Sequence, residues 1–208
     1  QEIAGEHGQQ VDKERFETEF RKHQQLSRAG SEQKFVGGLA DHSDQSIRYH
    51  TATHLLHRAL KNVLGDHVAQ KGSNITPERL RFDFNHPQKM TTEEIARVQV
   101  LVQEQIDANL PVHYELLTTD EAKAVGAIGL FEDTYAQLGA KVKVYFIGAP
   151  GGAFSTEICG GPHVARTGMI GQFRISKEEA ISQGVRRIKA VVEPPGGSVE
   201  VAGAASPR

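Results

Sequence analysis

The chain contains a single cysteine, Cys159, among its 208 residues. One cysteine cannot form a disulfide within the chain, and the sequence also lacks an apolar run long enough to span a membrane or to act as a signal peptide. We therefore expect a protein of the cytoplasm. A lone thiol is either buried and inert or a metal-binding or catalytic group, and its neighbours must decide between the two.

The chain also has little net charge, because 24 Lys and Arg residues stand against 26 Asp and Glu residues, which gives −2. A protein that binds nucleic acid unaided usually has a strong basic field. Any contact with RNA must therefore be local or be aided by regions outside this chain. The chain begins at Gln1, and its methionines are Met90 and Met169. We expect a fragment or a processed product of a longer protein.

Composition and apolar spacing predict three regions. Residues 1–45 hold a predicted helix, Val11 to Ala29, and a connecting segment with a turn at Gly37-Gly38. Residues 46–193 form the main domain, and 38% hydrophobic residues are enough to give it a core. Residues 194–208 are rich in Gly, Pro and Ala, which predicts a linker or a disordered tail.

Helices and strands intermingle in the main domain without strict alternation. Apolar spacing predicts helices near Ser46–Leu64, Thr91–Asn109 and Thr119–Val125. Predicted strands lie near residues 79–84, 111–117, 141–147, 153–158, 172–175 and 185–192. Alternation in the first of these strands places Arg79 and Arg81 on a solvated face. We expect an α+β fold with a mixed or antiparallel sheet packed against helices.

Four residues with metal-ligating side chains form two pairs. His50 and His54 lie one turn apart on one face of a predicted helix, with Cβ atoms roughly 6 Å apart, so both imidazoles can reach one ion. Cys159 follows a predicted strand, and Gly160-Gly161-Pro162 forces a tight turn that returns His163 toward the thiol. Thiolate and imidazole ligands favour zinc over magnesium or calcium. The sequence predicts a zinc site between a helix and a strand-turn segment.

The number of ligands decides what such a zinc ion can do. Four protein ligands close a structural site, whereas a catalytic site keeps one position for water. We expect His163, at the flexible side of the turn, to be the ligand that leaves this position to a nucleophilic water. Glu157 then either orients the water and accepts its proton or is a surface carboxylate. His57 is either a further ligand, a support for a ligand or a packed residue.

The motifs around these residues resemble a known family. His50-Thr-Ala-Thr-His-Leu-Leu-His57 and Cys159-Gly-Gly-Pro-His-Val164 are similar to the paired motifs of the editing domain of alanyl-tRNA and threonyl-tRNA synthetases and of free-standing alanyl-tRNA editing proteins. The similarity covers about Arg48 to Glu193. Further segments resemble the alanyl branch in order and spacing: residues 70–73, 79–84, 154–157 and 184–188. Pro162 instead resembles the threonyl branch, and residues 31–45 stand where alanyl synthetases have a small β-barrel.

The resemblance implies hydrolysis of seryl or glycyl esters on alanine tRNA, as part of an alanine–tRNA ligase. An alanine pocket cannot strongly reject glycine or serine, so a second site must remove the wrong product. The implied partners are mischarged tRNA and the remaining synthetase domains, and the implied cofactor is zinc. The implied metal ligands are His50, His54, Cys159 and His163. The resemblance also places Gln70 in the editing pocket.

The acceptor end of a tRNA is anionic, so cations are needed near the site. Cationic side chains cluster late in the chain, and the candidates for phosphate contacts are Arg174, Lys177, Arg186, Arg187 and Lys189. The alternative is an ordinary solvated strand face. A second hypothesis for the whole chain is a non-enzymic tRNA-binding or linker module with structural zinc. An unrelated zinc hydrolase is disfavoured because no His-Glu-x-x-His segment is present.

Overall fold

The computed structural model describes residues 43–129, 141–149 and 151–205. All of them lie in Val36–Arg208, the second of the two units into which the chain divides. The predicted helix over Val11–Ala29 and the Gly37-Gly38 turn lie outside the described residues. The described elements form an α+β fold of antiparallel sheets packed with helices, which confirms the predicted fold class.

The described helices are α3 (Asp44–Leu64), α4 (Thr92–Asp107), α5 (Thr119–Ala124) and the short 3-10 helix η2 (Thr167–Met169). None of the helices in the described ranges is long and apolar enough to cross a membrane. The strands are β1 (Gln70–Thr76), β2 (Arg79–Asn85), β3 (Val112–Leu117), β4 (Val142–Ile147), β5 (Ser155–Ile158), β6 (Gln172–Ser182) and β7 (Val185–Glu193).

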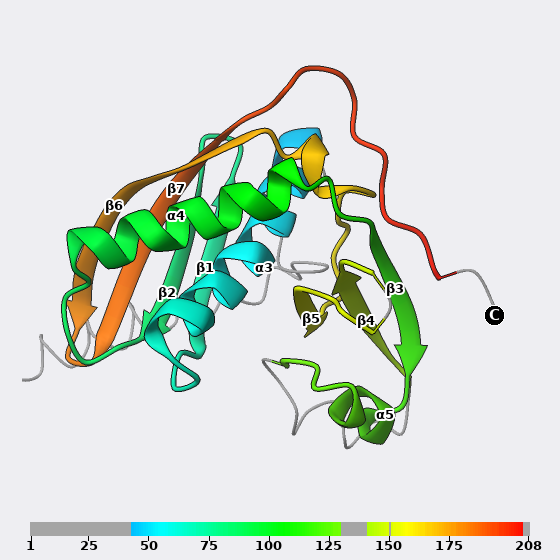
Figure 1. The fold of residues 1–208 in the computed structure, drawn as a ribbon, viewed down its shortest axis with the longest axis horizontal. Helices are drawn as coiled ribbons and strands as arrows, with labels where there is room; N and C mark the ends of the chain where they lie inside the picture. Colours follow the sequence, from blue (N-terminus) through cyan, green and yellow to red (C-terminus); the bar gives the residue numbers. More distant parts are fainter. Residues whose placement is uncertain (1–42, 130–140, 150, 206–208) are drawn as a thin grey trace, which may run out of the picture. The chain divides into compact units, whose positions relative to one another are not determined.

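The strands form a four-stranded sheet in the order β1-β2-β7-β6 and a three-stranded sheet in the order β3-β4-β5 (Figure 1). The sequence did not predict β1, because Lys71-Gly-Ser-Asn74 has no apolar alternation and the strand depends on pairing with β2. For the same reason β6 runs through Lys177-Glu-Glu179 well beyond the predicted end at Ile175. Polar strands are thus specified by their partners rather than by their own pattern.

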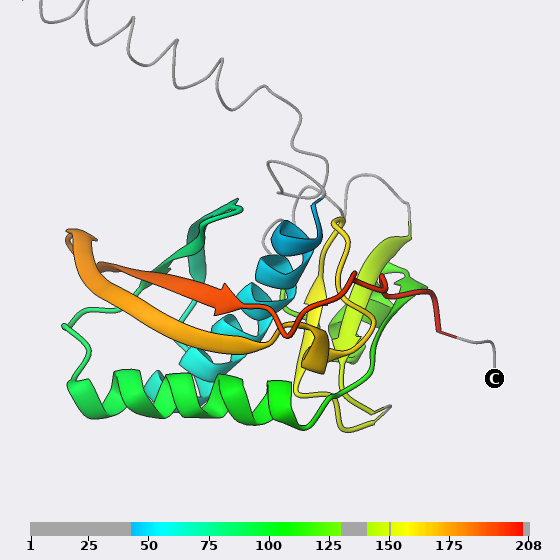
Figure 2. The same ribbon diagram turned by 90° about the horizontal axis from the view of Figure 1, so that it is seen from above.

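Helix α3 lies between the two sheets (Figure 2). Ser43 caps its first turn by accepting a hydrogen bond from the backbone N–H of Ser46, and Gly65 ends it with a positive φ of 115°. The helix contacts β1, β2 and β7 on one side and β5 on the other. Because both sides are covered, even polar residues of α3 are buried, which allows it to carry ligands inside the domain.

Helix α4 crosses in front of the four-stranded sheet (Figure 1). It begins with a capping box in which Thr91 and Glu94 exchange side-chain and backbone hydrogen bonds. Val98, Val102 and Ile106 are buried on its inner side. This helix matches the prediction because its caps and apolar stripe are local features of the sequence.

Strand β2 sends Leu80, Phe82 and Phe84 into the core, where none of them is exposed to solvent. Arg79 and Arg81, predicted on the solvated face of β2, are partly exposed, whereas Asp83 on the same face is only 6% exposed. Arg187 on β7 holds this carboxylate with two hydrogen bonds of 2.6 and 2.8 Å. A neighbouring strand therefore buries a charge that the alternation of β2 alone assigns to solvent.

Residues 194–205 are mostly exposed but are attached to the domain by backbone hydrogen bonds, and their assignment as a linker or tail stays a prediction. The N–H of Ala202 donates to the carbonyl of His163 (2.8 Å), and the N–H of Ala205 donates to that of Tyr114 (2.8 Å). Ala202 itself is buried. Backbone hydrogen bonds hold this segment, and amino-acid composition does not predict them, because every residue except proline carries the same backbone donor and acceptor.

Candidate metal centre

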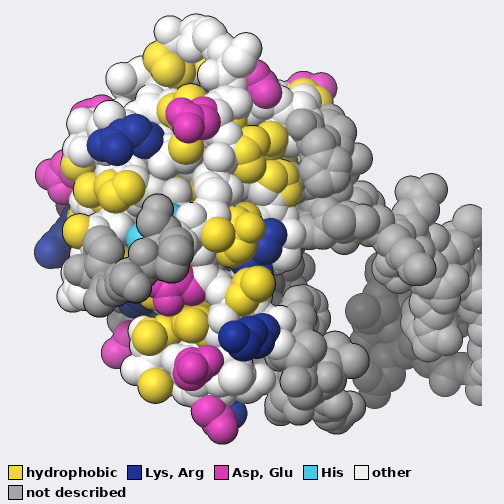
Figure 3. All heavy atoms as spheres, turned by 90° about the vertical axis from the view of Figure 1, so that its right-hand side faces the viewer, with side chains coloured by type: hydrophobic (Ala, Val, Ile, Leu, Met, Phe, Trp, Pro, Cys, Tyr) yellow, Lys and Arg dark blue, Asp and Glu magenta, His cyan; other side chains and the backbone are white. Residues whose placement is uncertain are grey.

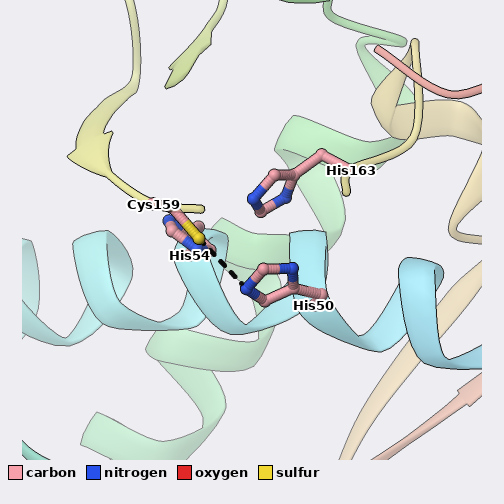
Figure 4. A group of neighbouring side chains, drawn as sticks. All are labelled: His50, His54, Cys159 and His163. Atoms are coloured by element: carbon pink, nitrogen blue, oxygen red, sulfur yellow. Dashed lines mark hydrogen bonds between the residues drawn. The ribbon is translucent and has the colours of Figure 1, made fainter. Parts of the chain in front are cut away.

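The two predicted ligand pairs meet in the structure. His50 and His54 project from α3, and Cys159 and His163 lie on the turn after β5, with all four side chains pointing toward one another (Figure 4). Their ligand atoms all lie within 4.8 Å of one another. A helix and a strand-turn segment thus assemble one group that could hold a metal ion, between the elements that the sequence predicts.

Backbone hydrogen bonds hold the turn over α3. The N–H of Cys159 donates to the carbonyl of Lys143 (3.0 Å), which continues the pairing of β5 with β4. On the far side of the turn, the N–H of Val164 donates to Oγ1 of Thr51 on α3 (3.1 Å). The turn is therefore attached at both ends, once to the smaller sheet and once to the helix.

Each of the three histidines is held by its Nδ1 atom. The Nδ1 atom of His50 lies 2.9 Å from the carbonyl oxygen of Pro162, and that of His54 lies 3.0 Å from Oε2 of Glu157. A carbonyl and a carboxylate only accept hydrogen bonds, so these imidazoles carry their protons on Nδ1. Their Nε2 atoms point toward Cys159, that of His50 from 3.3 Å, and a bound metal ion would take the place of the Nε2 proton.

The Nδ1 atom of His163 lies 3.2 Å from Oγ1 of Thr51. Because this hydroxyl donates to the carbonyl of Ile47 (3.2 Å), it accepts from the imidazole. The Nε2 atom of His163 is buried and makes no hydrogen bond in the described parts of the chain. A buried nitrogen lone pair beside a thiol and further imidazoles fits zinc, whose preferred ligands are nitrogen and sulfur.

That His163 leaves a ligand position to water stays a prediction, but the structure holds this residue tightly. His163 has no solvent exposure; its ring stacks on that of His50 and lies tilted against that of Tyr145, with centroids 4.2 Å apart in both cases. Cys159 is the member that is only partly buried. His163 is thus the most enclosed of the four.

Charge compensation inside the site is strong. Burial opposes every charge here, but the Glu157 carboxylate and Cys159 outweigh it and raise the pKa of His54 to about 10. In the same way, His54 and His57 lower the pKa of Glu157 against the effect of burial, and the histidines hold the pKa of Cys159 well below its usual range. The thiolate and the carboxylate make the site suited to a cation.

Glu157 is not the surface carboxylate that the sequence left open, because it is only 6% exposed. It accepts hydrogen bonds from His54, His57 and Ser155. His57 packs on Phe82, with ring centroids 5.3 Å apart, and does not belong to the group of four. Glu157 therefore contacts the ligand His54 directly, and His57 contacts Glu157.

Gln70 opens β1, and its amide donates to Oγ of Ser73 (3.1 Å). Ser73 is opposite Phe82 in the strand register, so the side chains of Ser73 and Phe82 lie on the same face of the sheet. His57 packs against Phe82 on that face. Within the described residues Gln70 makes no hydrogen bond to the ligand group. Its assignment to the editing pocket stays a prediction.

Four of the five side chains predicted to contact phosphates form ion pairs with carboxylates in the structure. Lys177 and Lys189 both pair with Glu179, Arg187 pairs with Asp83, and Arg186 pairs with Glu178. The fifth, Arg174, is exposed on β6. In the register Arg186 is opposite the buried Phe84 and so lies on the inner face, whereas Lys189 and Arg187 lie on the outer face.

Sequence reasoning missed several residues that hold the site. Thr51 and Tyr145 act through contacts with His163, and the carbonyl of Pro162 orients His50. No spacing rule points to them, since each contact joins separate elements. Ser155 was within reach, because it lies two residues before Glu157 on one strand and so shares its face.

Part of the chain matches the model of a known domain family. Residues 142–189, from β4 through most of β7, match the family model described as the threonyl and alanyl tRNA synthetase second additional domain. The matched segment contains Cys159 and His163, and α3 with the histidine pair precedes it. The match confirms the resemblance drawn from the motifs.

The particular relatives are alanine–tRNA ligases. The chain is 60% identical over 193 residues to the alanine–tRNA ligase of Treponema denticola, which covers 93% of this chain and 31% of the relative. Identity is 54% over 196 residues with the Treponema pallidum enzyme and 50% over 192 residues with that of Borreliella burgdorferi, again covering 31% of each relative. The chain thus spans about a third of the length of these curated relatives.

Proposed function

We propose that this chain is the editing domain of an alanine–tRNA ligase and hydrolyses seryl or glycyl esters of alanine tRNA, with zinc as its cofactor and the cytoplasm as its location. The convergence of His50, His54, Cys159 and His163 carries this proposal. The similarity to alanine–tRNA ligases supports the alanyl branch over the threonyl branch, although Pro162 resembles the latter.

The ligand set would hold zinc through the Nε2 atoms of the histidines and the sulfur of Cys159. Zinc held by these four ligands would have to expand to five-coordinate to admit a water, and it would then act as a Lewis acid and lower the pKa of that water. The protein keeps the three imidazoles oriented through Pro162, Glu157 and Thr51. Because Cys159 is the partly exposed member, we propose that substrate approaches on its side.

We propose that tRNA phosphates contact the outer face of the four-stranded sheet. We call this surface the cation face and define it by Arg81, Arg174, Lys177, Arg187 and Lys189. In the register Lys189 lies directly opposite Arg81 on one side and Lys177 on the other. Like charges in such positions cost stability, and this cost is offset in part because Glu179 pairs with both lysines and Asp83 pairs with Arg81 and Arg187. Bound phosphates would relieve the repulsion.

On the face seen in Figure 3, the described residues form no such surface. There Lys and Arg side chains are scattered among hydrophobic and acidic ones, and a histidine reaches the surface between them (Figure 3). The chain as a whole carries a formal charge of −2. The cation face is our candidate for a local cationic surface that contacts tRNA phosphates, on the other side of the sheet from α3.

A second candidate function is a non-enzymic tRNA-binding module with structural zinc. Its supporting observation is that all four ligand atoms lie close enough to enclose one ion. In that case the zinc ion would have no free position for water, and the protein would bind tRNA without cleaving the ester.

A deacylation assay tests the proposed function. We expect the zinc-loaded protein to release serine and glycine from alanine tRNA while it spares the alanyl ester. Seryl-tRNA for threonine is the control for the threonyl branch. Tight binding of tRNA with no release of any amino acid would support the module instead.

A further inference from the structure

Glu157 is a buried carboxylate whose two oxygens are both engaged. Oε2 lies 3.0 Å from Nδ1 of His54 and 3.3 Å from Nδ1 of His57. Oε1 accepts a hydrogen bond of 2.9 Å from the hydroxyl of Ser155. A carboxylate has about four acceptor directions, and three are used here by the protein. The protein itself therefore uses most of the acceptor capacity of this carboxylate.

His57 and Ser155 are placed to hold this carboxylate. His57 follows His54 on the same side of α3, and its ring is fixed against Phe82. Ser155 shares a strand face with Glu157, and both side chains are buried. Helix α3 and strand β5 thus fix the carboxylate from two directions.

We propose that Glu157 is a positioning residue for the metal ligand His54. By accepting the Nδ1 proton of His54, it fixes the plane and tautomer of the imidazole and keeps Nε2 turned toward the ion. His57 and Ser155 hold the carboxylate in the orientation that this requires. The inference rests on the proposed metal site, but it does not depend on hydrolytic activity.

Zinc affinity measured without tRNA tests this assignment. We compare wild type, Glu157→Ala and Glu157→Gln by competition with a chromophoric chelator. Loss of a carboxylate that supports a histidine ligand typically costs 10–100-fold in metal affinity. We expect a loss of about that size in Glu157→Ala and a smaller one in Glu157→Gln, which retains an accepting oxygen.

Glu178→Gln is the matched control, because it makes the same change in a carboxylate that is 2% exposed and bound to Arg186, away from the ligand group. Its zinc affinity should equal that of wild type. Cobalt(II) gives a second readout. Its visible absorption bands should change in Glu157→Ala, because the geometry of one ligand changes, and remain unchanged in Glu178→Gln.

Unaltered zinc affinity and cobalt spectra in both Glu157 variants would overturn the proposal, and a loss of deacylation alone would then assign Glu157 to the reacting water. If Glu157→Ala fails to fold, the nearly isosteric Glu157→Gln decides the question. Wild-type protein that binds zinc but releases no amino acid would contradict the proposed function and leave this inference standing.

Discussion

The Sγ atom of Cys159 lies 3.3 Å from the Nε2 atom of His50, and 109 residues of sequence separate the two. This contact joins the turn after β5 to helix α3 (Figure 4). Both atoms are ligand candidates of the proposed zinc site, so the predictions begin with them.

Substituting Cys159 should remove zinc binding. Cys159→Ala deletes the thiolate and leaves three imidazoles, so we expect zinc affinity to fall by at least 100-fold and deacylation to fall with it. Metal content after dialysis and the deacylation rate are the measurements. The circular dichroism spectrum should persist, because Cys159 is a partly buried residue at the edge of the core. Retained zinc would contradict the assignment of Cys159 as a ligand.

Removing zinc with a chelator should leave the domain folded. The core side chains Leu55, Phe82, Val102 and Ile188 pack together without the ligands. We expect reversible loss of activity and a lower melting temperature. At a free zinc concentration 100 times the dissociation constant, binding adds about 2.7 kcal/mol to the free energy of unfolding. Global unfolding on chelation would favour the module with structural zinc.

Neutralising the cation face should weaken tRNA binding. Each phosphate contact contributes about 0.7–0.9 to the slope of log affinity against log salt. The double variant Lys177→Gln, Lys189→Gln should therefore bind tRNA more weakly and with a shallower slope. Zinc affinity should be unaffected, since the outer face lies on the other side of the sheet from α3.

The matched control is Lys89→Gln combined with Lys123→Gln, two exposed lysines outside the larger sheet. Equal losses of tRNA affinity in the two double variants would reject the cation face as a specific contact surface.

The contact between His67 and His86 should make stability depend on pH. Nε2 of His67 lies 2.9 Å from Nδ1 of His86, and partial burial together with His67 lowers the pKa of His86 below its ordinary value near 6.5. The unfolded chain then binds the proton more readily, so this contribution to stability is lost as pH falls below about 6.5.

We expect NMR titration of His86 to give a lowered pKa in wild type and a value closer to normal in His67→Gln. The stability difference between pH 8 and pH 5.5 should shrink in the same variant. An unchanged titration of His86 would show that His67 is not responsible.

Local features of the sequence predict much of the fold. The caps of α4, its stripe of Val98, Val102 and Ile106, and the apolar alternation of β2 predict these elements within a few residues. In contrast, β1 and the far half of β6 are polar and form because partner strands supply their hydrogen bonds. Strand propensity depends on a residue and its sequence neighbours, so it does not predict a strand that forms because a partner strand pairs with it.

The candidate site divides in the same way. The sequence by itself determined which side chains are available: an i, i+4 histidine pair on a helix and a cysteine and histidine across a glycine-proline turn, whose chemistry favours zinc. Only the tertiary structure decided that the pairs meet, that His163 is the enclosed member, and that Glu157 lies behind His54. These outcomes depend on contacts between elements distant in sequence, and the burial and hydrogen bonds at such contacts follow no periodic pattern along the chain.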